Sequence, residues 1–359
     1  MNYPCIFWNL QRLFEPRGGD IARSLGVTSN NWTQKDYEYK IRNVAACLLK
    51  ITKGVQPALL GFAEVETLKI VQDLMKEAGW GDMISLDEVI PAPELKGHDV
   101  ALLYNSKVFK RKPVKARSLT LNNNFHTRDL LQVQLRLRKT DKEVDIVVLH
   151  WPSRVIREGD ILRMAHSFYL KNLISERLKF PVADLLNRNG SFSMPQPEAL
   201  LDRWNIPFII MGDFNDEPYD DSVREGLESS RDLRLVLNKA KLTGECLKKP
   251  EGYLASKFVL YNPCWSLRFA DTLEIGGTYY NSPEWKTYDQ LIVSHGLLIE
   301  NSPVKLVQES VQIPRLSKFD MNSETVSMMT EAGFPKEFDP LKPTGVSDHF
   351  PLYYEVLID

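Results

Sequence analysis

Short apolar segments, bounded by residues that favour turns, recur along the whole chain and predict a protein rich in β-strands. Most of them are rich in Val, Ile, Leu and aromatic residues, as expected for strands buried in a core. The predicted strands cover Tyr3–Trp8, Ala58–Val65, Asp99–Tyr104, Leu130–Leu137, Val144–Leu149, Phe208–Met211, Asp289–Val293 and Phe350–Ile358.

Helical periodicity appears between these strands. Thr33 and Asp36 have the spacing of a capping box, and apolar residues follow them at helical spacing. The apolar residues that follow this capping box are Ile41, Val44, Ala45 and Leu48, and two further predicted helices cover Glu66–Glu77 and Asp160–Lys179. Because strands occur before, between and after the helices, we expect one mixed α+β architecture with two β-layers and flanking helices.

The 359 residues show no internal repeat and no segment with the composition of a linker, so we expect a single domain over residues 1–359. Two segments resemble loop insertions in that domain. Residues 180–205 contain Pro195 and Pro197, and are expected to form a loop with a short helix. Residues 309–345 are polar, contain four prolines and form a long excursion before the last strand. Loops of this length usually serve a site or a partner.

The composition is that of an ordinary soluble globular protein, with 43% hydrophobic residues, 26% charged residues and a formal net charge of −2. Any surface that binds nucleic acid must therefore be local. None of the four cysteines forms a C-x-x-C pair, and Cys5 and Cys47 lie in apolar segments, which suggests free thiols in a reducing compartment. No cleavable leader and no apolar stretch near the length of a membrane span is seen, so we expect a cytoplasmic protein.

The most informative segment is Gly212-Asp213-Phe214-Asn215, which directly follows an apolar strand. Alternation along an extended chain places Asp213 and Asn215 on the same side. An Asp can accept a proton from water or bind a metal, and an Asn can donate a hydrogen bond to a developing oxyanion. This pair is therefore expected to form half of a centre that cleaves phosphoesters.

Other predicted strands also begin or end on a polar residue. A carboxylate such as Glu64 is unexpected in an apolar strand, because a buried carboxylate needs a cation or hydrogen bonds. A single strand end of this kind would usually be a solvated polar residue, but several suggest one shared rim. The strand-end residues are Asn9, Glu64, His150, Asp213, Asn215, Asp289, Asp348 and His349.

These residues, in this chain order, resemble the endonuclease/exonuclease/phosphatase superfamily, which has the DNase I-like fold. The Gly-Asp-Phe-Asn tetrapeptide is moderately specific and the other positions are individually weak, but together they cover almost the whole chain. Further segments are similar to markers of a bacterial branch: Asn9–Phe14, Trp32-Thr33, Asp99–Tyr104, Thr127–Asp129, His150–Arg154 and Gly277–Tyr279.

The resemblance implies a four-layer α/β/β/α sandwich, with the active site at one end of two stacked mixed sheets. It also implies that Mg²⁺ or Mn²⁺ is the cofactor. Glu64 and Asn9 would supply oxygen ligands, which suit such hard cations. Asp348 would bind the metal or a water molecule nearby.

The same resemblance assigns catalytic roles to the remaining rim residues. Asp213 would orient or deprotonate the attacking water, and Asn215 would donate a hydrogen bond to the charge that develops on the phosphoryl group. His349, oriented by Asp289, would donate to the scissile phosphate or act as an acid or base. His150 would contact phosphate oxygens.

Gln11 departs from the pattern of this branch, which usually has an acidic residue at that position. A neutral amide can still coordinate a metal but removes one negative charge, so weaker metal binding or a ligand relayed through water is expected. The alternative, that Gln11 is only a polar residue at a strand end, has equal weight.

Candidate contacts to substrate are basic. Arg128 could bind phosphate oxygens through a bidentate fork. The segment from Lys107 to Arg117 holds six basic residues and no acidic one, and Lys110, Arg111 and Lys112 could follow a phosphate backbone. A solvated loop between two strands is the commoner explanation of such a segment.

Three functions remain open on the sequence alone. The first is a metal-dependent phosphoester hydrolase acting as an endonuclease or other nuclease, with DNA favoured over RNA as the partner. The second is a phosphatase or phosphodiesterase acting on a small-molecule, inositol or lipid phosphoester. The third is a binding module without catalysis, which is disfavoured because the residues needed for water activation are present. The sequence gives no indication of oligomeric state or biological pathway.

Overall fold

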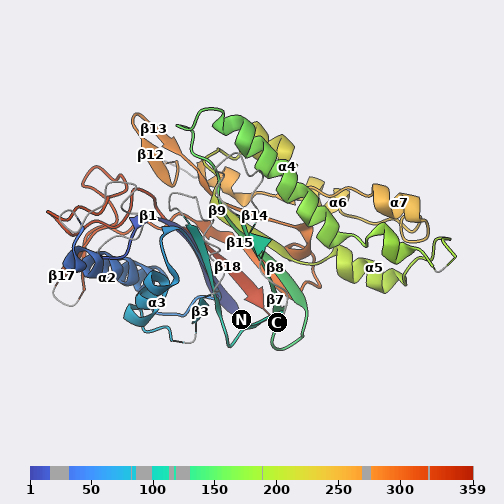
Figure 1. The fold of residues 1–359 in the computed structure, drawn as a ribbon, viewed down its shortest axis with the longest axis horizontal. Helices are drawn as coiled ribbons and strands as arrows, with labels where there is room; N and C mark the ends of the chain where they lie inside the picture. The colour runs from blue at the N-terminus through green and yellow to red at the C-terminus, as the bar shows by residue number, and fades with distance from the viewer. Residues whose placement is uncertain are drawn as a thin grey trace.

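Two large β-sheets, packed face to face, form the centre of the computed structural model, which describes residues 1–16, 32–81, 83–85, 99–112, 117–118, 130–187, 189–268, 276–321 and 324–358 (Figure 1). Within these ranges the first sheet has six strands. In sheet order they are β15 (Val304–Gln312), β18 (Leu352–Ile358), β1 (Asn2–Leu13), β2 (Leu59–Val65), β4 (Asp99–Asn105) and β3 (Met83–Ser85).

The second sheet has eight strands in the same described ranges, seven of them along its main path. In order they are β10 (Ser229–Ser230), β11 (Leu260–Tyr261), β14 (Asp289–Val293), β9 (Phe208–Asp213), β8 (Glu143–His150), β7 (Leu130–Leu137) and β5 (Phe109–Arg111), with β6 (Arg117–Ser118) also paired to β7. Both sheets mix parallel and antiparallel pairs. For example, β8 runs parallel to β9, whereas β14 runs antiparallel to β9.

The main hydrophobic core lies between the two sheets. Alternate side chains of each strand enter it, so Phe7 of β1 and Met211 of β9 belong to one buried cluster. Gly61 of β2 lies at the closest approach, because a Cβ atom there would meet the Phe7 ring at 3.0 Å and the Met211 sulfur at 3.1 Å. This close packing fixes the position of one sheet relative to the other.

Helices cover the outer face of each sheet. The helices α2 (Gln34–Ile51) and α3 (Leu68–Glu77) pack on the first sheet through one apolar cluster, and α4 (Gly159–Leu178) and α5 (Pro197–Trp204) pack on the second through another. In Figure 1, α2 and α3 lie on one side of the strands, and α4, α5, α6 (Leu233–Lys239) and α7 (Pro250–Ala255) on the other. The α/β/β/α sandwich predicted from the sequence is confirmed.

Short elements connect these layers. Two hairpins lie outside the large sheets: β12 (Tyr279–Asn281) with β13 (Glu284–Lys286), and β16 (Phe319–Met321) with β17 (Glu324–Val326). The remaining single turns of helix are η1 (Val182–Leu185), η2 (Ser222–Gly226), η3 (Pro263–Arg268) and η4 (His295–Leu297).

The local signals in the sequence correspond closely to the observed elements. Thr33 and Asp36 form the predicted capping box, with the Thr33 side chain accepting from Asp36 N and the Asp36 side chain accepting from Thr33 N. The β1 strand runs five residues beyond the predicted end at Trp8, through an irregularity in its pairing with β2 after Asn9. The last strand begins at Leu352 rather than at the predicted Phe350, since Pro351 has no amide hydrogen to donate.

The two predicted insertions have different structures. Residues 180–205 contain η1 and α5, in agreement with the expected loop and short helix. Residues 309–345 contain the end of β15 and the β16–β17 hairpin, and their later part reaches the candidate site through Glu337 and Phe338. All four cysteines are free thiols, and three of them are buried. Among the helices of the described ranges, none is both long and apolar enough to cross a bilayer.

Candidate active site

The predicted rim residues of the second sheet meet at one end of its central strands. In the β8–β9 pair His150 lies opposite Asp213, and in the β9–β14 pair Asp289 lies opposite Asp213. Strand register alone therefore places an imidazole and two carboxylates side by side. Gly212 permits this arrangement, because a Cβ atom at that position would lie 2.2 Å from the backbone oxygen of Leu149 on β8.

The first sheet contributes Asn9 and Glu64 to the same place. Asn9 is at the irregularity of β1, and its Nδ2 donates to Asp213 Oδ2 at 3.0 Å and to Glu64 Oε1 at 3.3 Å. The site therefore spans both sheets, with one amide joining a carboxylate from each of them.

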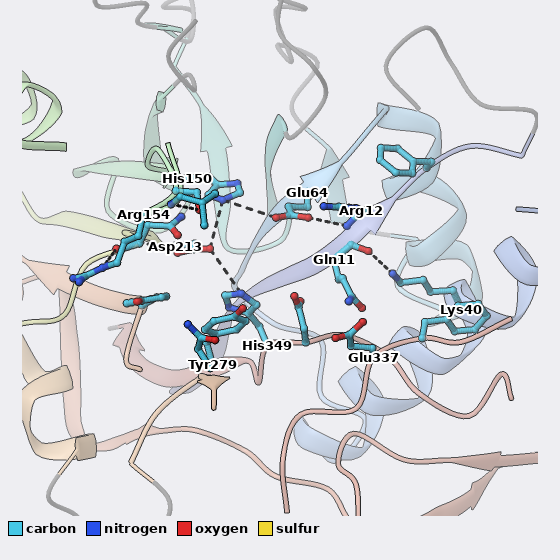
Figure 2. A pocket seen from close by; sticks show the side chains of 18 of the residues that line it. Gln11, Arg12, Lys40, Glu64, His150, Arg154, Asp213, Tyr279, Glu337 and His349 are labelled. Carbon is cyan, nitrogen blue, oxygen red and sulfur yellow. Dashed lines mark hydrogen bonds and ion pairs between the residues drawn. The ribbon is translucent and has the colours of Figure 1, made fainter. Parts of the chain in front are cut away.

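Asp213 is the centre of this arrangement and is almost fully buried. Besides the Asn9 amide, His150 Nε2 lies 3.5 Å and His349 Nε2 lies 4.0 Å from its Oδ2. The other carboxylate oxygen of Asp213, Oδ1, accepts a hydrogen bond from the backbone N–H of Asn215 at 2.9 Å. The carboxylate is thus fixed in orientation, with two imidazoles facing one oxygen (Figure 2).

His349 forms a hydrogen-bonded pair with Asp289. The Nδ1 atom lies 2.7 Å from Asp289 Oδ2, and both side chains are buried. Burial alone would lower the pKa of His349, but Asp289, with Asp348 and Asp213 nearby, outweighs it and raises the pKa to about 10. Because Nδ1 is bonded to Asp289, Nε2 faces the pocket as a proton donor. The Tyr279 ring lies against this imidazole, with a centroid distance of 4.7 Å.

Backbone strain is concentrated at this end of the sheets. Gln11, Arg12, Glu64 and Asn215 all have φ between 49° and 61°, in the left-handed region that L-residues seldom adopt. Gln11, Arg12 and Glu64 lie at irregularities within β1 and β2, and Asn215 lies two residues after the end of β9. Such strain persists only where the surrounding structure holds it, and it is often found at functional sites. At this site the strained backbone turns side chains toward the pocket, whereas a regular strand would direct those side chains elsewhere.

The oxygen donors predicted to hold a metal lie on the first-sheet side of the pocket. Asn9 Oδ1 accepts Gln11 N at 3.0 Å, and Glu64 Oε2 accepts Arg12 N at 2.9 Å. Gln11 Oε1 is buried and has no hydrogen-bond partner within the described part of the chain. Burial raises the pKa of Asp348, with the negative charges of Glu64 and Glu337 acting in the same direction. An oxygen without a donor and several crowded carboxylates fit the needs of a hard divalent cation.

A second arrangement also satisfies simple metal geometry. Asp213, Asp289 and His349 offer ligand atoms that all lie within 4.8 Å of one another. The short hydrogen bond between Asp289 and His349 already accounts for two of these groups. We therefore favour the side of the cavity formed by Glu64 and Gln11 as the place where a cation would bind.

These residues surround a cavity of about 760 Å³ that opens to solvent. Figure 2 shows Asp213, His150 and His349 on one side of it, and Gln11, Lys40 and Glu337 on the other. Of the predicted residues, those that line it are Gln11, Glu64, His150, Asp213, Asn215, Asp348 and His349. Asn9 and Asp289 lie directly behind them, bonded to Asp213 and His349.

Lys40 lines the same cavity and was missed by the sequence analysis. Its Nζ donates to the backbone oxygen of Gln11 at 2.5 Å and lies 5.9 Å from the ring centres of Trp32 and Phe338. Burial lowers its pKa to about 8, although the carboxylates around the cavity act in the opposite direction. A sequence signal existed, because Lys40 lies on the apolar face of its helix next to Ile41.

Arg154 is the second residue that was not predicted as part of the site. Its Nε donates to the backbone oxygen of Asn215 at 2.8 Å, and its guanidinium also binds Asp216 and Asp220. It therefore supports the strained backbone at Asn215 from outside the sheet. Its only sequence signal was the marker segment His150–Arg154.

Three of the predicted basic contacts, Lys110, Arg111 and Lys112, are not among the residues that line the cavity. Lys110 lies in β5 opposite Arg136 and is paired with Asp141 at 2.6 Å, and Lys112 is paired with Glu143 at 2.6 Å. Glu143 begins the strand that His150 ends, so these lysines lie at the far end of the sheet, roughly 23 Å away at 3.3 Å per residue. Arg111 follows in the same short strand. Arg128 lies outside the described residues.

A sequence model described as the Endonuclease/Exonuclease/phosphatase family matches residues 6–178 and 198–357. The chain belongs to this family. The match includes every predicted rim residue. The members of the family are hydrolases of phosphoesters, and that is the reaction class to which this chain is assigned. No curated protein matches the chain by sequence.

Solved structures of the endonuclease/exonuclease/phosphatase superfamily share the fold at low identity. ANGEL2, described as a 2′,3′-cyclic phosphatase in complex with adenosine-2′,3′-vanadate, is 15% identical with a TM-score of 0.56, covering 99% of this chain and 95% of that one. A mannosyl-6-phosphatase from Bacteroides thetaiotaomicron is 12% identical with a TM-score of 0.52, covering 99% and 100%. D. rerio TDP2, complexed with a single-strand DNA product, is 12% identical with a TM-score of 0.51, covering 99% of each chain. At these identities the likeness shows the fold alone.

Proposed function

We propose that this chain is a divalent-metal-dependent phosphoester hydrolase whose reaction centre is Asp213. The observation that supports it best is the placement of this buried carboxylate between His150 and the His349–Asp289 pair, beside oxygen donors of the other sheet. The group places a proton acceptor, Asp213, 4.0 Å from a proton donor, His349 Nε2, beside a cavity that opens to solvent, which suits acid–base catalysis of the attack of water on phosphorus.

Asp213 accepts a proton from the attacking water, because its orientation is fixed by Asn9 and by the Asn215 backbone. His349, kept protonated by Asp289, donates from Nε2 to a phosphoryl oxygen or to the departing oxygen. The Asn215 amide uses one N–H to bind the backbone oxygen of Trp151 at 3.0 Å, and its other N–H can reach the charge that develops on the phosphoryl group. His150 binds a phosphate oxygen from the second-sheet side.

Glu64, Asn9, Gln11 and Asp348 would hold Mg²⁺ or Mn²⁺, and the bound ion would polarise the phosphoryl oxygen and stabilise the leaving oxygen. Their oxygen donors suit such a cation, and Gln11 Oε1 is already buried without a donor in the described chain. Asn9 has a second part in the site, since its amide nitrogen bonds both carboxylates.

The proposed substrate is a DNA phosphodiester, the substrate that the sequence favours, and this fold is known to bind DNA in D. rerio TDP2, which is complexed with a single-strand DNA product. A small phosphomonoester is the second candidate. One observation favours the phosphomonoester. The lysines that suggested DNA binding in the sequence form ion pairs at the far end of the sheet, so they do not contribute positive charge to the pocket. A role as a binding module alone is disfavoured, because the centre retains its acid and base groups.

The test is hydrolysis by the purified protein with Mg²⁺ or Mn²⁺, offered supercoiled plasmid, linear DNA, RNA and a panel of phosphomonoesters. If the product is nicked plasmid, the result supports an endonuclease. If the product is free phosphate, the result supports a phosphatase. EDTA should abolish either activity. The Asp213→Ala protein is the negative control, and Asp202→Asn, an exposed carboxylate at the far end of the sheet, is the matched control. No hydrolysis of any substrate by the wild-type protein would refute the proposal.

A further inference from the structure

A three-residue segment, Gly277-Thr278-Tyr279, lies against the His349–Asp289 pair without taking part in the proton transfers proposed for this site. We refer to these three residues as the clamp. Gly277 and Thr278 are buried, whereas Tyr279 lines the cavity and begins the β12–β13 hairpin. Figure 2 shows the Tyr279 and His349 side chains on the same side of that cavity.

The clamp is hydrogen-bonded to the backbone at both members of the pair. Thr278 Oγ1 accepts a hydrogen bond from Asp289 N at 3.2 Å, and Thr278 O accepts one from Phe350 N at 2.7 Å. Tyr279 also pairs with His349 in an isolated antiparallel bridge. One threonine therefore fixes the backbone of Asp289 relative to the residue that directly follows His349.

The ring of Tyr279 restrains the imidazole of His349 itself. The two ring centroids lie 4.7 Å apart, with 31° between the ring planes. The hydrogen bond from Asp289 holds His349 Nδ1, but one such bond does not fix the plane of the ring, and a second ring packed against it does. Tyr279 is held in turn by the buried Tyr288, whose ring is stacked on it at a centroid distance of 5.8 Å.

The clamp is anchored by contacts that do not involve the cavity. Thr278 N donates to Lys286 O at 2.8 Å, and a Cβ atom at position 277 would lie 2.3 Å from that same oxygen, so this close approach depends on glycine. The next residue, Thr287, donates its backbone N–H to the buried carboxylate of Glu217 at 3.0 Å. The position of the clamp is therefore set by the fold before any substrate is bound.

We propose that Thr278 and Tyr279 are positioning residues that hold the imidazole of His349 in a fixed orientation toward Asp213. Thr278 fixes the backbone on both sides of the pair, and Tyr279 fixes the plane of the ring whose Nε2 lies 4.0 Å from Asp213 Oδ2. Neither residue forms or breaks a bond in the reaction. The expected effect on hydrolysis rests on the proposed function, but the order of the His349–Asp289 pair can be measured without a substrate.

The measurement without turnover is the proton NMR signal of His349 Nδ1–H. A proton held in a short hydrogen bond to a carboxylate resonates far downfield, and it is observed only when the bond is ordered and exchanges slowly with water. We expect this signal in the wild-type protein and in Tyr279→Phe, and its loss in Tyr279→Ala and in the isosteric Thr278→Val. His349→Gln assigns the signal by removing it. The matched control, Tyr261→Ala, removes a half-buried tyrosine ring from β11 and should leave the signal unchanged.

The same variants give a kinetic test with the substrate found in the hydrolysis panel. Tyr279→Ala should lower kcat by about tenfold or more with little change in KM, because a slightly misplaced proton donor weakens the transition state and not substrate binding. Tyr279→Phe keeps the ring and should keep the wild-type kcat. Thr278→Ser keeps the oxygen that accepts Asp289 N, so it should retain the activity that Thr278→Val loses.

Several results would overturn the inference. One is a wild-type protein without the downfield signal, and another is a signal that survives in both Tyr279→Ala and Thr278→Val. Equal loss of the signal in Tyr261→Ala would indicate general loosening of the fold. Equal loss of kcat in Tyr279→Phe and Tyr279→Ala would assign the effect to the hydroxyl group, as a contact with substrate. If Tyr279→Ala does not fold, the comparison of Thr278→Val with Thr278→Ser gives the same test.

The two proposals can fail separately. A wild-type protein that hydrolyses none of the substrates refutes the proposed function, while the NMR signal and its loss in the clamp variants still support the clamp. Hydrolysis by the wild-type protein, with an unchanged signal and unchanged kcat in the clamp variants, refutes the clamp alone.

Discussion

His349 Nδ1 and Asp289 Oδ2 lie 2.7 Å apart although 60 residues separate them in the chain. This pair fixes the tautomer of His349 and aims Nε2 at Asp213. Replacing Asp289 by Asn leaves the shape but removes the charge, so we expect the rate of phosphoester hydrolysis to fall by on the order of a hundredfold or more. The measurement is kcat with the substrate found in the panel. A variant that folds normally and keeps the wild-type kcat would contradict this assignment of His349.

Asp213 is predicted to be indispensable. Without its carboxylate, Asp213→Ala should lose about a hundredfold or more in rate, because no other carboxylate in the centre is oriented by both Asn9 and Asn215. Single-turnover kinetics measures the loss without interference from product release. Asp202→Asn should retain the wild-type rate. Turnover by Asp213→Ala comparable to wild type would remove Asp213 from the mechanism.

Gln11→Glu should tighten metal binding. The substitution places a carboxylate where Gln11 Oε1 is buried without a donor in the described chain, and an added negative ligand favours a divalent cation. We expect the Mg²⁺ concentration that gives half-maximal activity to fall by about tenfold, or ~1.4 kcal/mol. Isothermal titration of the metal gives an independent value. An unchanged midpoint would mean that Gln11 does not contact the cation.

The basic segment allows a direct test of a prediction made from sequence. If Lys110, Arg111 and Lys112 follow a phosphate backbone, reversing their charges should weaken DNA binding and reduce its salt dependence. The ion pairs of Lys110 with Asp141 and of Lys112 with Glu143 lead us to expect otherwise. DNA affinity should stay constant while the urea midpoint of unfolding decreases slightly, because exposed ion pairs contribute little to stability. The salt dependence of DNA affinity and the midpoint of urea unfolding, measured for the wild-type protein and the variant, distinguish the two expectations.

Two buried histidines should make the fold sensitive to acid. Burial lowers the pKa of His166 and of His295 to about 4, from an ordinary value of 6.5. Between these pH values the unfolded chain binds the protons and the folded chain does not, so the free energy of unfolding falls as the pH drops from 6.5 toward 4. The slope should approach ~1 kcal/mol per pH unit for each histidine. Urea unfolding at several pH values measures it, and His166→Gln should make the slope shallower.

The fold and most of the site could be predicted from the sequence, because both depend on signals that are local in the chain. The apolar segments that lead to Asn9, Glu64, His150 and Asp213 can be recognised in the sequence alone. The order of these four residues along the chain is what suggested the family. The pairing of His349 with Asp289 was expected only through the resemblance, since a strand pattern does not say which ends meet.

Other parts of the site depend on tertiary structure and left weak signals. Lys40 was overlooked because a lysine is usually placed in solvent, and only packing shows that its ammonium group reaches Gln11. Arg154 contributes through a backbone oxygen, for which side-chain patterns carry no information. The ion pairs of Lys110 and Lys112 could not be read from the sequence, because their carboxylate partners come from a turn and another strand.

The indole of Trp8 donates to the backbone oxygen of His349 across a separation of 341 residues, and the first part of β1, from Asn2 to Phe7, pairs with β18. The strand β1 is thus completed by a strand that lies more than 330 residues later in the chain. A growing chain can fold its helices and central strands early, yet it lacks its proton donor until β18 has joined β1. Hydrolytic activity should therefore appear only after β18 has joined β1, so the onset of activity would report the time of that folding step.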